Sequence, residues 1–305
     1  MTRIVSGWIL LFLGTLLLAA GLITLIIGPE EVQKVPLDVD TDTFLTGQAQ
    51  KLNPATGEVE DVPVKVLSNT KVDPKKSDDK VVVWVNYACV NIDRDDPPDC
   101  LKADDDRLIS NTMDTFASDR HTGIAVNDAK YVGKDATKHE GLVNKFPFNT
   151  EKKSYQLWDS LLGTTVTATY DSTVELDGLK TYKFTVDVPK TDAKIAGDVE
   201  GTYQAEKTIW VEPRTGAIVD QEQHEKRLLP DGSVVLDMSL EFTDATVKQS
   251  IARGQDSFGL LDLVGRTVPI VGILGGLICL GAAGFLLLAP RRRTPAVDQQ
   301  EYAQV

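Results

Sequence analysis

The sequence predicts a mainly β protein, in which a curved antiparallel sheet or an elongated β-barrel lies between two transmembrane helices. An uncharged apolar stretch lies near each end of the chain, and apolar and polar residues alternate along much of the middle. Of the 305 residues, about 240 lie between the two stretches, which is enough for one large domain or two small ones.

The two apolar stretches span residues 7–27 and 270–289 and contain no charged residue. Each is long enough to cross the roughly 30 Å hydrocarbon core of a bilayer as a helix. A cleaved signal peptide is the alternative for the first stretch, because Ala19, Ala20 and Gly21 are small. The apolar run is longer than that of a typical signal peptide, which favours a retained anchor.

Arginines indicate which ends of the anchors face the cytoplasm. Arg3 precedes the first stretch, and three arginines follow the second at residues 291–293. Because positive residues flank membrane helices on the cytoplasmic side, the sequence predicts cytoplasmic ends at 1–6 and 290–305 and an extracytoplasmic domain at 28–269 of a plasma-membrane protein. The net charge of −13 argues against nucleic acid as a partner, since an acidic domain repels phosphates.

Glycines recur in both anchors, and small residues let helix backbones approach closely in lipid. We therefore expect the anchors to pack together or to contact another membrane protein through their glycine faces. The alternative is that glycine is simply common in membrane helices. The glycines are Gly7, Gly14, Gly21 and Gly28 in the first anchor, and Gly272, Gly276, Gly281 and Gly284 in the second.

Period-two alternation is clearest at residues 182–189 and 234–243, and it is typical of antiparallel strands with one buried face. Residues 81–87 are rich in valine, residues 164–170 are rich in β-branched side chains, and residues 207–211 surround a tryptophan. Each of these segments predicts a further strand. Turn signals separate the strands at Asp177-Gly178, Arg214-Thr215-Gly216 and Asp231-Gly232.

The turn at Asp177-Gly178 predicts one long hairpin over residues 164–189. Long strands joined by tight turns favour a strongly curved sheet or a barrel. Residues 28–80 contain fewer apolar residues, and we expect only short strands there, with a solvated loop at 73–80. Apolar residues at helical spacings over 247–264 predict an amphipathic helix near the membrane.

Cys89 and Cys100 lie outside the apolar stretches, whereas Cys279 lies within the second. In an oxidising compartment the pair is expected to form a disulfide, which would contribute roughly 3 kcal/mol by closing a short loop. Two free thiols are the alternative. Aspartates crowd the neighbouring residues 93–106, where a solvated loop is favoured over a calcium site because the glycine and terminal glutamate of an EF-hand are missing.

No motif predicts catalysis. The sequence lacks a Gly-x-Ser-x-Gly elbow, a phosphate-binding glycine loop and a Cys-x-x-Cys pair, and neither His139 nor His224 has the second histidine of a zinc-protease helix. We therefore expect no enzyme activity, no catalytic residue, no cofactor and no metal site. Large aromatic side chains are the remaining candidates, although an ordinary core uses the same residue types. The candidates for lining a lipid cavity are Trp84, Phe146, Phe148, Trp158, Tyr182, Phe184 and Trp210.

Three segments between the anchors carry a resemblance: Asp-Arg-His-Thr-Gly at 119–123, Gly-Leu-Val-Asn-Lys-Phe-Pro-Phe-Asn-Thr at 141–150, and Pro-Arg-Thr-Gly at 213–216. In this order they resemble an actinobacterial envelope family whose members are labelled PorA-like porins or, after a lipoglycan-biosynthesis protein, LmcA-like. The resemblance implies a barrel-like domain on the outer side of the plasma membrane, internal cavities suited to a lipid, and a role in elongating or moving mannosylated lipoglycans.

The leading hypothesis is a non-enzymatic, membrane-anchored envelope protein that binds or presents a lipid or glycolipid in lipoglycan assembly. The alternative is a structural or adaptor subunit of a membrane complex, with no ligand of its own. An enzyme acting on envelope glycans ranks third, because no pair of carboxylates at a defensible spacing is evident. An apolar cavity of at least roughly 300 Å³ would favour the first hypothesis over the second.

Overall fold

The computed structural model describes residues 2–288, so the predicted tail at 290–305 and its three arginines lie outside the described residues. The chain divides into two compact units. One unit is residues 33–259, and the other joins residues 1–32 to residues 260–305.

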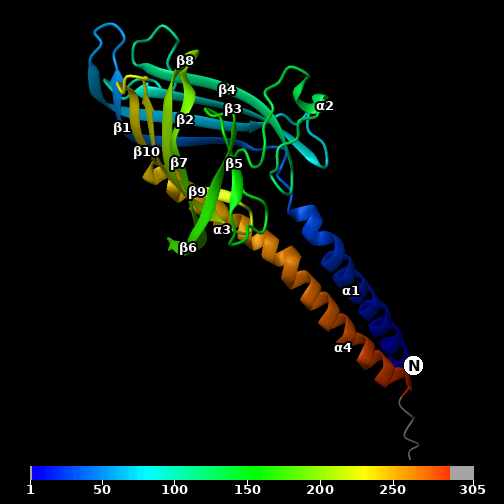
Figure 1. Cartoon of the computed structure of the whole chain (residues 1–305). Helices are drawn as coiled ribbons and strands as arrows, with labels where there is room; N and C mark the ends of the chain where they lie inside the picture. Colours follow the sequence, from blue (N-terminus) through cyan, green and yellow to red (C-terminus); the bar gives the residue numbers. More distant parts are fainter. Residues whose placement is uncertain (1, 289–305) are drawn as a thin grey trace, which may run out of the picture. The chain divides into compact units, whose positions relative to one another are not determined.

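The unit that joins the two ends of the chain is helical (Figure 1). It contains α1 (Thr2–Val32) and α4 (Val268–Leu288), with a π-helical segment at Leu263–Thr267 before α4. By length and composition, the helical segments Arg3–Gly28 and Leu263–Leu288 could each cross a membrane. The prediction of two apolar helices flanking a β domain is therefore confirmed.

Glycines bring α1 and α4 into close contact. A Cβ atom added to Gly21 would lie 2.9 Å from the backbone nitrogen of Ile273, and one added to Gly276 would lie 2.8 Å from the nitrogen of Leu18. Side chains at these positions would force the helices apart. By contrast, no described atom lies within 4 Å of a Cβ at Gly281 or Gly284.

We expect Gly21→Leu to separate α1 from α4, because leucine cannot occupy the space now filled by the facing backbone. Spin labels on the two helices, measured by electron paramagnetic resonance in nanodiscs, should report a longer and broader distance distribution. Gly281→Leu is the matched control and should leave the distribution unchanged. An unchanged distribution in the Gly21 variant would contradict this packing.

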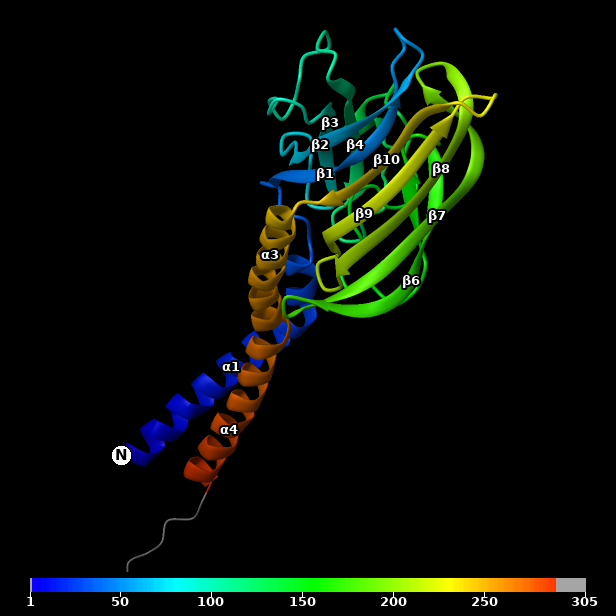
Figure 2. The same ribbon diagram turned by 90° about the vertical axis from the view of Figure 1, so that its left-hand side faces the viewer.

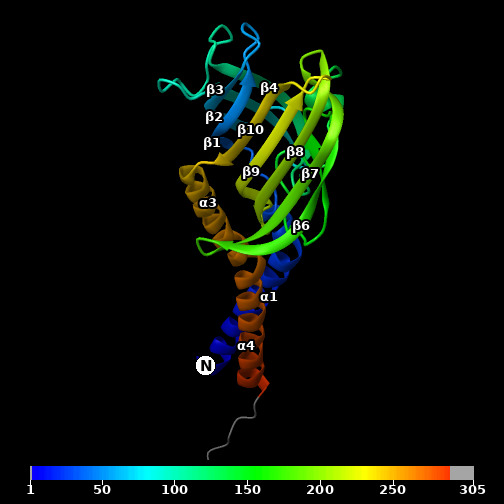
Figure 3. The ribbon, with the colours of Figure 1, turned by 60° about the vertical axis from the view of Figure 1, so that its left-hand side comes forward.

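The other unit is a single antiparallel sheet, which Figure 2 and Figure 3 show curling on itself. Its ten strands have the spatial order β4-β3-β2-β1-β10-β9-β8-β7-β6-β5, so two consecutive meanders meet where β1 pairs with β10. The predicted fold class, mainly β with a curved antiparallel sheet, is confirmed. The strands are β1 (Asp40–Leu52), β2 (Val59–Val72), β3 (Val81–Ile92), β4 (Leu108–Asp119), β5 (Tyr155–Asp159), β6 (Thr164–Leu176), β7 (Leu179–Ala196), β8 (Val199–Glu212), β9 (Ala217–Leu228) and β10 (Val234–Phe242).

Two predictions about local structure are confirmed and one is wrong. The hairpin of β6 and β7 turns at Asp177 and Gly178, whose positive φ angles of 46° and 80° suit the tight turn. A helix, α3 (Asp244–Asp262), follows β10 as the helical spacing predicts. The expectation of only short strands over 28–80 is wrong, since β1 and β2 contain 13 and 14 residues. Many polar residues on their exposed positions had hidden the alternation.

The apolar positions of the strands form the core. Leu236, Met238 and Leu240 of β10 are buried beside Val64 of β2, as the period-two alternation of this strand predicts. A second cluster lies on β7 and β8 and includes Phe184, Ile209 and Val211. The two clusters lie on either side of β9, whose residues 220–227 are all polar or charged.

The predicted disulfide is confirmed, since Cys89 of β3 is bonded to Cys100 with a Cα–Cα distance of 5.4 Å. Cys89 is fully buried. The bond holds the acidic loop that follows β3 against the sheet. In this loop Asp105 accepts hydrogen bonds from Arg107, which lower the pKa of Asp105 to about 2.

Candidate functional site

The structure distributes the seven candidate aromatic residues among separate clusters. Phe146 and Phe184 are fully buried, with ring centroids 4.7 Å apart, and Tyr182 is partly buried in the same cluster. Trp84 lies in another cluster with Phe148 at its margin. These residues belong to the packed interior of the β unit.

The two remaining tryptophans lie elsewhere. Trp158 of β5 packs against His139, with ring centroids 4.9 Å apart. Trp210 of β8 packs beside Val219 and Ile251, where α3 meets the sheet. None of the seven residues lines either of the two larger pockets described next, and their role in lining a lipid cavity stays a prediction.

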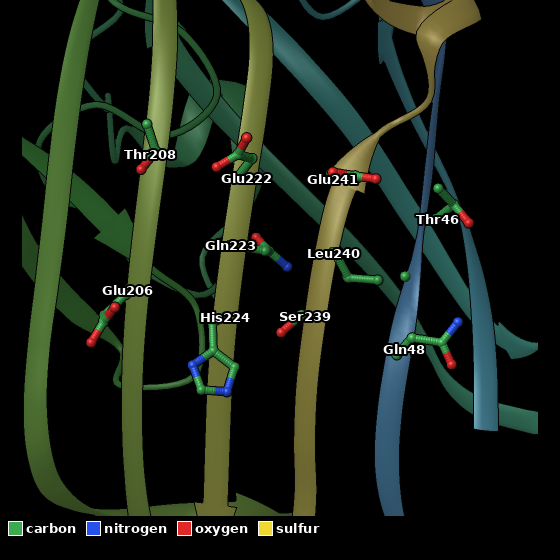
Figure 4. Close-up of a pocket in the computed structure, with 11 residues that line it drawn as sticks. Thr46, Gln48, Glu206, Thr208, Glu222, Gln223, His224, Ser239, Leu240 and Glu241 are labelled. Atoms are coloured by element: carbon green, nitrogen blue, oxygen red, sulfur yellow. The ribbon is translucent and has the colours of Figure 1, made fainter. Parts of the chain in front are cut away.

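A pocket of about 450 Å³ lies across β8, β9, β10 and β1 (Figure 4). We call it the polar groove. Most of its side chains come from the polar positions of these strands, whereas the intervening positions of β10 contribute to the core. The groove is lined by Thr46, Gly47, Gln48, Glu206, Thr208, Glu222, Gln223, His224, Ser239, Leu240 and Glu241.

Strand register arranges eight of these residues in two adjacent rows across the four strands. One row runs Thr46, Glu241, Glu222, Thr208, and the other runs Gln48, Ser239, His224, Glu206. In the first row, Glu222 and Glu241 are direct cross-strand neighbours, and like charges in this position destabilise a sheet. The groove therefore places two glutamates opposite one another on neighbouring strands.

A second pocket of about 590 Å³ adjoins the groove, since Thr46, Glu222 and Glu241 line both. It adds further acidic side chains, including Asp220 of β9. Burial raises the pKa of Asp220, and the nearby charges of Glu222 and Glu241 act in the same direction. The two pockets together form one acidic, hydrogen-bonding surface.

His224 at the end of the groove is paired. Its Nε2 lies 2.6 Å from Oδ1 of Asp237, and Nζ of Lys226 lies 2.7 Å from Oδ2 of the same carboxylate. Burial acts to raise the pKa of Asp237, but hydrogen bonds from Lys226 and His224 outweigh it, so this pKa lies below its usual value. In the part of the chain that the structure describes, no three His, Cys, Asp or Glu residues are placed to hold a metal ion.

The three segments of the family resemblance meet at one place, which we call the junction. Phe148 donates its backbone N–H to the carbonyl of His121 at 3.2 Å, and Asn149 donates to the carbonyl of Arg214 at 3.0 Å. Gly216 has a φ of +72°, and a Cβ atom there would overlap the carbonyl of Phe146. These short motifs therefore fix the fold of residues 141–150 between two turns.

The junction contains a buried amine that has no hydrogen-bond partner among the described residues. Although Lys145 is partly exposed along its chain, its Nζ is buried and lies 3.9 Å from the ring centroid of Phe148. Burial lowers the pKa of Lys145 to about 7, and the charge of Asp119 only partly opposes this effect. Asp119 accepts its hydrogen bonds from His121 and Thr122 instead.

The sequence alone does not predict the register of the two rows. The groove carboxylates occupy the polar positions of strands that the sequence predicts, but which residues lie opposite one another depends on the pairing of β1 with β10.

Comparison with known proteins identifies the family of the chain. The family described as Porin PorA matches the chain over residues 6–285, and no curated protein matches it.

Proposed function

The chain belongs to the Porin PorA family, and from this premise we propose that it is a non-enzymatic envelope protein that binds the glycan part of a membrane glycolipid. The family match and the two apolar helices support a membrane-associated protein of the envelope. In this proposal both termini are cytoplasmic and the β unit is extracytoplasmic, as Arg3 favours.

The observation that carries the proposal is the pair of rows in the polar groove. Sugars present many hydroxyl groups, each of which can donate a hydrogen bond to a carboxylate or an amide oxygen. The rows offer Glu206, Glu222 and Glu241 together with amide and hydroxyl side chains. Hydrogen bonds to charged acceptors are stronger than those between neutral groups, and donors from a ligand would offset the repulsion between Glu222 and Glu241.

The size and charge of the groove restrict the class of ligand that it could bind. Its volume of about 450 Å³ falls within the usual range for small-ligand sites. The acidic lining disfavours a free phosphate or carboxylate, and the scarcity of apolar side chains disfavours an acyl chain. A neutral glycan, such as the mannose units of a lipoglycan precursor, fits both conditions, and its lipid part would remain in the membrane.

The family description includes the word porin, but the surface of the sheet does not support a channel made of these strands. Strands of a membrane barrel carry a continuous apolar band toward the lipid. Among the described strand residues, the exposed large hydrophobic side chains are Phe44, Val59, Met113 and Val199. Most of the others lie on α1 and α4, which supports helices as the membrane-embedded part.

An adaptor role without a ligand is the second candidate, and the anchors provide the observation that favours it. Gly7, Gly14 and Gly21 of α1 and Gly272 and Gly276 of α4 are occupied by contacts between the two helices. Gly281 and Gly284 face open space among the described residues. A partner helix could approach α4 closely at that point.

The proposal is tested by titrating the full-length protein in nanodiscs with a soluble mannose oligosaccharide and measuring binding by calorimetry. Glu222→Gln should weaken binding about tenfold or more, because a hydrogen bond to a charged acceptor becomes a neutral one. The same substitution should slightly raise the thermal midpoint of unfolding, since it removes a like-charge pair.

Glu175→Gln is the matched control, because Glu175 is an exposed strand residue of β6 outside the groove. It should change neither binding nor stability. The glycan site would be refuted if the unsubstituted protein did not bind the oligosaccharide, or if the Glu222 variant bound it with the same affinity as the unsubstituted protein. Either result would favour the adaptor role.

A further inference from the structure

The curled sheet has two ends, and isolated β-bridges join these ends through the segment between them. β4 and β5 are the outermost strands in the sheet order. Ser118 of β4 pairs with Ala125, Ile124 pairs with Leu142, and Leu142 pairs with Leu157 of β5. We call this line of contacts the seam.

A buried histidine lies at the seam. His139 is 2% exposed. Its ring packs against Phe116 of β4, with centroids 5.3 Å apart, and against Trp158 of β5, with centroids 4.9 Å apart. Its backbone is fixed by Asn127, which accepts from the His139 N–H at 3.0 Å and donates to its carbonyl at 2.7 Å. One side chain thus contacts both ends of the sheet.

Both nitrogens of this ring face hydrogen-bond acceptors. Nδ1 lies 3.0 Å from the carbonyl oxygen of Thr137, and Nε2 lies 2.7 Å from Oδ2 of Asp114 on β4. A neutral imidazole carries one N–H and can donate only one of these bonds, whereas an imidazolium carries two and can donate both. The geometry therefore matches the doubly protonated ring, with Asp114 as the carboxylate partner.

We propose that His139 is a protonation-dependent latch across the seam. In the closed state, the imidazolium bonds the segment 133–140 to β4 while its ring bridges β4 and β5. Loss of one ring proton removes the positive charge of the ring, weakens the charge-assisted bond between Nε2 and Asp114 that joins the segment to β4, and releases the segment. The seam between the two outermost strands then opens toward the inner face of the sheet.

Other charged residues lie on β5 and beside His139 in sequence, and among the described residues Asp114 is the carboxylate that bonds the ring. On β5, Asp159 is already bonded to the backbone N–H groups of Leu161 and Leu162 and to the hydroxyl of Tyr203. Lys138 and Glu140 flank His139 in sequence and carry opposite charges. The protonation state of the ring is therefore coupled mainly to one carboxylate.

The first test observes the ring directly. The chain has three histidines, so ¹⁵N-histidine NMR of the full-length protein in nanodiscs can be assigned with His121→Gln and His224→Gln variants. At mildly acidic pH, both ring nitrogens of His139 should appear protonated, with slow exchange of the protons. A neutral ring with a single N–H in this closed state would overturn the proposal.

The second test measures the release of the segment 133–140. Hydrogen exchange of the unsubstituted protein, corrected for intrinsic rates, is compared across the titration of the ring. Loss of the proton should lower the protection of residues 133–142 about tenfold to a hundredfold, as expected for a lost charge-assisted bond. His139→Phe keeps an aromatic ring between Phe116 and Trp158, and it should show low protection at every pH.

His224→Phe removes a histidine outside the seam and should retain the pH response of residues 133–142. Protection that does not change while the ring titrates would overturn the latch, even if the Phe variant fails to fold. The latch is independent of the proposed glycan site, because neither His139 nor Asp114 lines the groove.

Discussion

Replacing Lys145 with methionine should raise the free energy of unfolding by roughly 5 kcal/mol at pH values below 7. Burial lowers the pKa of Lys145 from 10.5 to about 7, and each pH unit of such a shift corresponds to about 1.4 kcal/mol. Methionine fills a similar space against Phe148 and has no charge to desolvate. Chemical denaturation of the full-length protein measures the difference.

The gain in unfolding free energy from Lys145→Met should decrease as the pH rises from 7 to 10.5. Between pH 7 and 10.5 the unfolded chain binds more protons at Lys145 than the folded chain, so the unsubstituted protein gains stability as the pH rises. The advantage of the variant should therefore shrink across this window and vanish above it. Lys190→Met, at an exposed position of β7, is the control and should have little effect. A constant difference at all pH values would show that the amine is not buried as described.

Leu236→Asp should prevent folding of the β unit. Leu236 is 5% exposed and packs in the core cluster of β1, β2 and β10, so the substitution buries a charge without a partner, at a cost of several kcal/mol. Ser239→Asp places the same side chain on the solvated face of the same strand and should leave the fold intact. Circular dichroism and protease resistance of the two variants provide the comparison, and equal tolerance would contradict the period-two assignment.

Regular alternation and turn chemistry determined which elements could be predicted. The strand that contains Leu236 has one apolar face, and the hairpin at Asp177 has a tight turn. Short-range sequence patterns therefore predict both elements. In β1, Gly47 interrupts the alternation as well, and it lies so close to β10 that a Cβ atom there would overlap the Ser239 carbonyl. The need for this glycine comes from a partner strand nearly two hundred residues away in sequence, and no local pattern contains it.

The candidate sites also depend on contacts between residues that are far apart in the sequence. Glu222 and Glu241 look like ordinary surface residues of separate strands until the register places them opposite one another. Nothing near His139 in the sequence predicts the carboxylate of Asp114 at its ring. The aromatic residues were recognised as apolar, but whether each one packs in the core depends on contacts made after folding.

The pairing of β1 with β10 also sets the order of events during synthesis. β1 is among the first parts of the β unit to be made, yet one of its edges remains without a partner until β10 has been translated. Pairings between segments so far apart in sequence form slowly. β10 leads through α3 to α4, so the sheet becomes complete only shortly before the second anchor is translated. A nascent chain of this protein therefore exposes an unpaired edge of β1 for most of its synthesis, and an edge of this kind favours aggregation.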